Sequence, residues 1–422
     1  MGENQIYDVV VIGAGPAGMM AAGQAALAGA RVVLLEKTDT PGKKLSITGK
    51  RRCNLTNAAD LPEFIDHFGP NGRFLHQAFG RFFRDDLLEF FETIGVSTET
   101  ERGGRIFPSN GDAQFVTQQL LEWSLEAGAR VMLRSPVDQL VFENGHISAI
   151  TTRDKQTIPA KAVILCTGGA TFTGTGSTGD GYYMAQAVGH TLVPLRPALV
   201  PLKTDGRTAQ RLQGLSLRNI RLSVFFDQKK VIDTFGEMLF THFGVSGPVV
   251  LTHSGEIVDA LRAGKQVSLS VDLKPALDES KLDARLLREL DQGGKQHVRT
   301  MLKRLLPAKM IAVCADQSKI PQDRLCHQVT AQDRRRLLTW LKNLRLDVTA
   351  SLPLDAGMVT MGGVSLKEVD PRTMMSKVVD GLFFAGEVLD LAADTGGFNL
   401  QAAFSTGWLA GQCAASQTLN KK

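Results

Sequence analysis

The chain has 422 residues, enough for two or three domains with a buried core. Hydrophobic residues make up 43% and charged residues 22%, a balance typical of globular proteins that excludes wholesale disorder. No run of about 18 apolar residues occurs, and the five cysteines are scattered without a CxxC pair. We therefore expect a cytoplasmic protein with reduced thiols, no membrane span and no metal site.

The charge is unevenly distributed. Lys and Arg number 48 against 43 Asp and Glu, a net charge of +5, but the segment from Lys295 to Arg345 holds twelve basic and three acidic residues. This block predicts contact with a polyanion such as RNA, and the alternative is an ordinary solvated helix face. Trp340 lies within the block, but one aromatic residue does not make a stacking platform.

The N-terminal segment predicts a βαβ unit that binds a dinucleotide. Tyr7–Ile12 is an apolar strand, Pro16–Gly29 a helix, and Arg31–Leu35 a second strand that is closed by Glu36. Between strand and helix runs the turn Gly13-Ala14-Gly15-Pro16-Ala17-Gly18. Its glycines permit a tight turn, close approach to a pyrophosphate and tight helix packing, while Glu36 can accept from ribose hydroxyls.

The elements that follow alternate between helices and strands. We predict one helix over Phe74–Ile94, whose phenylalanines pack in the core, and another over Ala113–Ala127. Strands over Ser135–Phe142 and His146–Thr152 flank an Asn144-Gly145 hairpin turn.

Three further glycine-rich segments favour FAD over NAD as the dinucleotide. Thr167-Gly168-Gly169 ends one strand, Gly386-Glu387 ends another with Asp390 close behind, and Gly397-Phe398-Asn399 leads through Gln401 into the last helix. The start of that helix can stabilise the negative charge of a reduced flavin. The remaining cofactor candidates are Lys37, Lys44, Asn54 and Val137.

A second GxGxxG pattern, Gly174 to Gly179, is not expected to form its own dinucleotide site. It lies several residues beyond its strand, and no acidic residue closes a following strand. We expect a loop beside the flavin or the substrate. NADH or NADPH would then bind transiently over the flavin as the electron donor.

Together these motifs resemble the YhiN/BaiN-like family of bacterial flavoproteins. The segments Leu45–Asn57 (LSITGKRRCNLTN) and Phe240–Pro248 (FTHFGVSGP) match family signatures, although Lys50-Arg51 stands where the family often has glycines. The resemblance implies an FAD domain interrupted by a β-rich domain and a small helical one. It also implies reduction of an activated C=C bond, with dihydrouridine formation in ribosomal RNA and reduction of bile-acid-type steroids among the family's activities.

The change in character along the chain predicts an α/β protein with a discontinuous Rossmann-like domain. The FAD-binding domain would comprise residues 1–193 and 353–422, a β-rich inserted domain 194–275, and a basic helical inserted domain 276–352.

Three residues are candidates for catalysis. Cys53 follows Lys50-Arg51-Arg52, whose charges would lower a thiol pKa, and the alternative is a small residue packed near the flavin. Arg52 is expected to orient an anionic group of the cofactor or substrate. His242 is a candidate acid–base residue, with a structural loop histidine as the alternative.

The sequence therefore predicts an FAD-dependent oxidoreductase, with uridine in ribosomal RNA as the leading substrate. A small-molecule reductase or oxidase acting on a steroid-type enone, an amine or a hydroxy acid is the second hypothesis. A flavin-bearing RNA-binding factor without turnover is the third.

Overall fold

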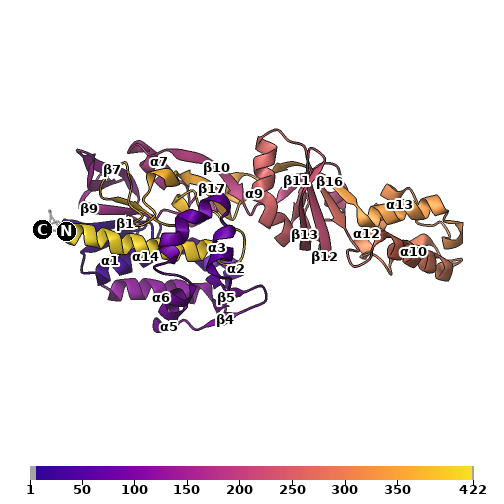
Figure 1. Cartoon of the computed structure of the whole chain (residues 1–422), viewed down its shortest axis with the longest axis horizontal. Helices are drawn as coiled ribbons and strands as arrows, with labels where there is room; N and C mark the ends of the chain where they lie inside the picture. Colours follow the sequence, from indigo (N-terminus) through magenta and orange to yellow (C-terminus); the bar gives the residue numbers. More distant parts are fainter. Residues whose placement is uncertain (1–5, 421–422) are drawn as a thin grey trace. The chain divides into compact units, whose positions relative to one another are not determined.

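The computed structural model describes residues 6–420 and divides the chain into two compact units (Figure 1). The first, called here the Rossmann unit, comprises Met1–Pro197 and Gly357–Lys422, and the second, the barrel unit, comprises Ala198–Ala356. The predicted α/β fold with a discontinuous Rossmann-like domain is confirmed. No helix within residues 6–420 is long and apolar enough to cross a membrane.

The Rossmann unit is built on a seven-stranded sheet in the order β6-β2-β1-β9-β8-β7, with β18 beside β9. The central pairs β2–β1, β1–β9 and β9–β18 are parallel, whereas β7 and β8 form an antiparallel extension. Parallel strands buried on both faces read as continuous apolar runs, as in VVVI of β1. The strands are β1 Tyr7–Ile12, β2 Val32–Leu35, β6 Arg130–Met132, β7 Val137–Glu143, β8 His146–Thr152, β9 Thr157–Leu165 and β18 Leu382–Phe384.

Two small sheets complete the strands of this unit. One pairs β10 with β17, and the other has the order β3-β5-β4. Their strands are β3 Thr56–Asn57, β4 Thr98–Thr100, β5 Arg105–Pro108, β10 Leu192–Ala198 and β17 Val359–Val364.

Two long helices from opposite ends of the sequence pack against each other over the sheet (Figure 1). They are α1, Pro16–Leu27, and α14, Phe398–Leu419. Small residues allow this approach, because a Cβ on Gly407 or Gly411 would lie 2.4 Å from a backbone oxygen of α1. The other helices are α2 Lys43–Arg51, α3 Leu61–Asp66, α4 His76–Phe79, α5 Arg84–Thr93, α6 Ala113–Glu126 and α7 Asp180–Ala187.

The single helix predicted over Phe74–Ile94 is wrong. A 3-10 segment, Gly69–Leu75, is followed by the short α4, which ends at Phe79 with Gly80 as its C-cap, and α5 then begins after Phe83. The Asp86 carboxylate accepts from the Phe83 N–H at 2.8 Å and so starts a new helix. The phenylalanines do pack in the core, as expected, with Phe79 and Phe83 rings 5.2 Å apart.

The barrel unit contains a closed barrel of six strands in the order β11-β14-β13-β12-β15-β16. One continuous apolar core joins it to its helices, and the predicted boundary at residues 275 and 276 stays a prediction. Its strands are β11 Leu202–Thr204, β12 Ser216–Phe226, β13 Lys229–Phe240, β14 Gly244–Ser246, β15 Val267–Asp272 and β16 Leu344–Ser351. Its helices are α8 Thr208–Arg211, α9 Pro248–Arg262, α10 Glu279–Gly293, α11 Val298–Leu302, α12 Ala308–Ser318 and α13 Ala331–Lys342.

Candidate functional site

The turn between β1 and α1 has the close packing and the open space that a phosphate-binding turn needs. Gly13 has a φ of +100°, and a Cβ there would lie 2.6 Å from the Cys166 carbonyl oxygen. A Cβ on Gly18 would lie 1.8 Å from the Gly13 oxygen, so the third glycine is a packing requirement. A Cβ on Gly15, in contrast, would meet nothing within 4 Å. The N-terminus of α1 therefore faces open space, where its free N–H groups can receive an anion.

Glu36 stands beside this turn at the end of β2. Its Oε2 accepts from the Ala14 N–H at 3.0 Å, and its Oε1 accepts from the Thr38 N–H at 2.8 Å. These bonds hold the carboxylate in place, and each oxygen keeps a lone pair for a further donor. The arrangement suits the two hydroxyls of a ribose.

A cavity runs from this turn across the carboxyl ends of the parallel strands. Its empty volume, open solvent at the mouth included, is about 1420 Å³, and all of its walls come from the Rossmann unit. The predicted cofactor residues on its walls are Gly13, Gly15, Pro16, Ala17, Glu36, Lys37, Lys44, Val137, Thr167, Gly168, Gly386, Glu387 and Asn399. The structure thus brings both glycine-rich ends of the chain to one cavity.

Seven predicted cofactor residues do not line the cavity: Gly18, Asn54, Gly169, Asp390, Gly397, Phe398 and Gln401. Several of them support its walls instead. The Asp390 carboxylate accepts from the Gly362 N–H at 3.0 Å, and Gln401 Oε1 accepts from the Thr56 hydroxyl at 2.6 Å. Asp390 thus fixes the segment after β18 to β17, and Gln401 fixes the first turn of α14 to β3.

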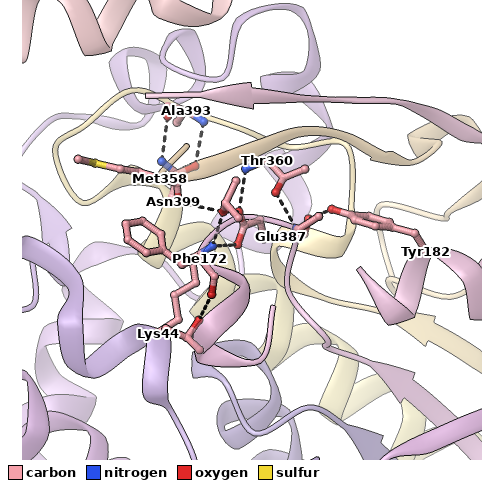
Figure 2. Close-up of polar contacts among 11 residues, drawn as sticks. Lys44, Phe172, Tyr182, Met358, Thr360, Glu387, Ala393 and Asn399 are labelled. Carbon is pink, nitrogen blue, oxygen red and sulfur yellow. Dashed lines mark hydrogen bonds and ion pairs between the residues drawn. The ribbon is translucent and has the colours of Figure 1, made fainter. Parts of the chain in front are cut away.

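An ion pair joins two walls of the cavity. Lys44 Nζ lies 2.7 Å from Glu387 Oε2 and also donates to the Thr171 hydroxyl at 2.9 Å (Figure 2). Glu387 Oε1 accepts from the Thr360 N–H at 2.8 Å, and the Tyr182 hydroxyl donates to the Glu387 carbonyl at 3.2 Å. The sequence indicated Lys44 and Glu387 separately, but nothing in it pairs residues 343 positions apart.

Other cavity residues were not predicted. The apolar ones include Leu45, Phe68, Met184, Met358 and Leu400. Thr175, Gly176 and Ser177 also contribute, so the second GxGxxG pattern lies on the wall of the same cavity. That pattern was the sequence signal for this loop, whereas the apolar residues carry no local signal that separates a cavity wall from a core.

The three catalytic candidates are not gathered in this cavity. Cys53 is fully buried, and burial raises the pKa of its thiol to about 12, opposite to the shift that its basic neighbours predict. Its environment fits the packing alternative. The Arg52 guanidinium pairs with Glu101 and lies 4.4 Å above the centre of the Phe107 ring. His242 lies in the barrel unit between β13 and β14, exposed, with its ring against Phe243.

The polar atoms of the cavity fit FAD. The Thr167 hydroxyl, on the cavity wall, is buried and has no hydrogen-bond partner within residues 6–420. Gly15 leaves room for a pyrophosphate over the start of α1, and Glu36 offers acceptors for a ribose. An unpaired buried hydroxyl calls for a partner, and a bound cofactor supplies one.

Comparison with known proteins agrees with this geometry. Residues 7–413 match the family model described as HI0933-like protein Rossmann domain. The chain belongs to this family. It is a family of flavin-dependent oxidoreductases, and the chain is one of these enzymes.

Two full-length relatives have names that state an activity. The 3-dehydro-bile acid delta(4,6)-reductase of Clostridium scindens is 32% identical over 96% of this chain and 98% of its own length. The ribosomal RNA dihydrouridine synthase of Escherichia coli is 29% identical over 96% and 97%. Among solved structures, the fold is similar to that of a flavocytochrome c3 fumarate reductase, with a TM-score of 0.55 and 19% identity over 99% of this chain and 79% of the other.

Proposed function

We propose that this protein reduces the C=C bond of uridine in ribosomal RNA to dihydrouridine, with electrons that NADH or NADPH delivers through FAD. The observation that carries the choice of RNA is the charge of the barrel unit, which holds 25 Lys and Arg against 17 Asp and Glu. A basic surface is the electrostatic footprint of a nucleic-acid partner. The dihydrouridine synthases of E. coli and Haemophilus influenzae, both 29% identical, support the same choice.

The basic segment from Lys295 to Arg345 contains two kinds of cation. Five are ion-paired: Arg304, Arg324, Arg334, Arg336 and Lys342. The other seven are exposed and have no ion pair within residues 6–420: Lys295, Arg299, Lys303, Lys309, Lys319, Arg335 and Arg345. The unpaired group is proposed to meet RNA phosphates, whereas Arg304 and Arg334 bind Glu289 and Asp283 of α10.

The chain's own residues bind and orient the cofactor in this proposal. The N–H groups at the start of α1 receive the pyrophosphate, and Glu36 accepts from the ribose. Lys44 and Glu387 lie on the cavity wall with Asn399, whose side chain is fixed by hydrogen bonds of 2.9 Å to both backbone groups of Ala393 (Figure 2). When bound, FAD supplies the hydride.

The remaining proposed roles concern substrate and proton. Apolar walls such as Leu45, Met184 and Leu400 exclude water from the cavity. The acid–base role of His242 stays a prediction from the sequence, because the residue lies in the barrel unit and does not line the cavity. Arg52 is kept as a residue that orients an anionic group, and its pairing with Glu101 restrains it.

A second candidate is reduction of a bile-acid-type enone. Two apolar side chains near the Lys44–Glu387 pair are unusually exposed, Phe172 at 38% and Met358 at 43% (Figure 2). An exposed apolar pair beside a cavity suits a flat apolar substrate. The bile acid reductase of C. scindens supports this alternative.

The test compares the dihydrouridine map of large-subunit ribosomal RNA, by mass spectrometry, in cells with and without the gene. We expect one dihydrouridine to disappear on deletion and to return with the wild-type gene. As a matched control, the deletion strain receives the gene for the Gly15→Ala variant, which we expect to fold but to bind FAD weakly. An unchanged map contradicts the RNA proposal. Rapid oxidation of the reduced protein by a bile-acid-type enone, and not by RNA, would favour the second candidate.

A further inference from the structure

The segment from Lys43 to Arg52, which covers α2 and the residue after it, carries five cations, and three of them are paired. Lys43 Nζ lies 2.7 Å from Asp39, Lys44 Nζ lies 2.7 Å from Glu387, and Arg52 pairs with Glu101. The remaining two, Lys50 and Arg51, are exposed and have no ion pair within residues 6–420. Three charges of the segment are thus neutralised by carboxylates, and the two adjacent charges of Lys50 and Arg51 are not.

The backbone of these two residues is also unusual. The φ angles of Lys50 and Arg51 are +60° and +70°, and they follow Gly49 at +56°. Side chains other than glycine rarely adopt this left-handed conformation, because the Cβ crowds the following carbonyl. Strain of this kind concentrates at functional sites, and here it holds two charged residues where glycine would fit without strain.

The position of the turn relates it to the cavity. Leu45 and Thr48, just before it, line the cavity. Just after it, the Thr56 hydroxyl donates to Gln401 in the first turn of α14 at 2.6 Å. The two unpaired cations therefore lie at a turn that interrupts α2 after Thr48, between residues that line the cavity and a strand that is bonded to the first turn of α14.

We propose that Lys50 and Arg51 bind consecutive backbone phosphates of the RNA substrate beside the base that is reduced. This inference rests on the proposed function. RNA carries one phosphate per nucleotide, so two adjacent cations can meet two phosphates, and arginine can bind its phosphate through two parallel hydrogen bonds. A steroid with one carboxylate offers a single charge and satisfies half of the pair.

The test uses the double variant Lys50→Gly/Arg51→Gly in the full-length protein with FAD. Glycine keeps the left-handed backbone, so the change removes the charges without adding strain. The control is Lys155→Gly, because Lys155 is also exposed, has a φ of +65° and belongs to the same unit, in the turn between β8 and β9. Unlike Lys50 and Arg51, Lys155 is ion-paired, with Asp138 at 3.1 Å. The visible absorbance of bound flavin reports whether each variant has folded.

The measurement is the affinity for a fluorescein-labelled oligouridylate, by anisotropy at several KCl concentrations. The slope of log K against log salt is negative, and each lost phosphate contact on single-stranded RNA reduces its magnitude by about 0.7. We therefore expect the magnitude to fall by about 1.4 in the double variant and to change little in the control. An unchanged slope in the double variant overturns the inference.

The failure of this inference can be separated from the failure of the proposed function. If wild-type protein forms dihydrouridine in ribosomal RNA and the double variant binds RNA like wild type, the inference alone is wrong. If wild-type protein forms none, the proposed function is wrong. A raised KM in the double variant for a carboxylated steroid enone, without any change for RNA, overturns the assignment to phosphate.

Discussion

A substitution at Gly15 tests whether FAD binding needs a glycine at a position where the fold does not. Its φ of −82° and ψ of −174° are ordinary extended values, and a Cβ there meets nothing within 4 Å. Gly15→Ala therefore leaves the folded state without strain, and the lower entropy of the unfolded chain raises the apo stability by about 0.4–1 kcal/mol. At Gly18, in contrast, a Cβ would lie 1.8 Å from the Gly13 oxygen, so Gly18→Ala costs about 1–3 kcal/mol of apo stability.

The effect of Gly15→Ala on FAD is opposite in sign to its effect on stability. The new methyl group occupies the space through which a pyrophosphate approaches the backbone, and the loss of one charge-assisted hydrogen bond is worth about 1.5–3 kcal/mol. This corresponds to FAD binding about 10- to 150-fold weaker. Urea unfolding of the apoprotein and flavin-fluorescence titration measure the two effects separately. If Gly15→Ala binds FAD as tightly as wild type, the pyrophosphate does not lie on this turn.

Three further predictions concern other parts of the molecule. Iodoacetamide at pH 8 should leave Cys53 unmodified in the folded protein and modify it in the protein unfolded by guanidinium. The reason is that burial raises the pKa of this thiol to about 12. Equal rates of modification in the two states would contradict the burial. Burial lowers the pKa of His190 below its usual 6.5, so as the pH falls the unfolded chain binds a proton at His190 before the folded protein does. The free energy of unfolding should therefore decrease as the pH drops through 6.5. Urea unfolding at pH 7.5 and 5.5 measures the decrease, and an equal decrease in His190→Gln would refute the assignment to His190. Arg334→Ala should lower the free energy of unfolding by about 0.5–1 kcal/mol, because Arg334 binds both Asp283 oxygens. Arg335 has no ion pair within residues 6–420, so Arg335→Ala should leave the stability unchanged and weaken RNA binding. Equal melting temperatures for the two variants would argue against this division.

The parts of the fold that follow from local pattern could be predicted from the sequence. The strand over Tyr7–Ile12, the turn at Gly13 and the acid at Glu36 each have a local chemical reason, and the structure places them together. The hairpin at Asn144-Gly145 is similar, because both residues take the positive φ that its short turn requires.

What the sequence could not predict depends on contacts between distant segments. The Lys44–Glu387 pair needs the sheet to bring both ends of the chain together. The burial of Cys53 is of the same kind, because it comes from the core around the residue and its charged neighbours in the sequence do not reveal it. The helix over Phe74–Ile94 failed because apolar spacing alone does not reveal the break at Gly80.

The visible spectrum of the purified wild-type protein, with the released flavin identified and counted, tests the central claim most directly. Our account predicts a yellow protein with about one FAD per chain, bound in the cavity that Gly15, Glu36 and Glu387 line. A colourless protein that takes up no FAD on reconstitution would contradict the account.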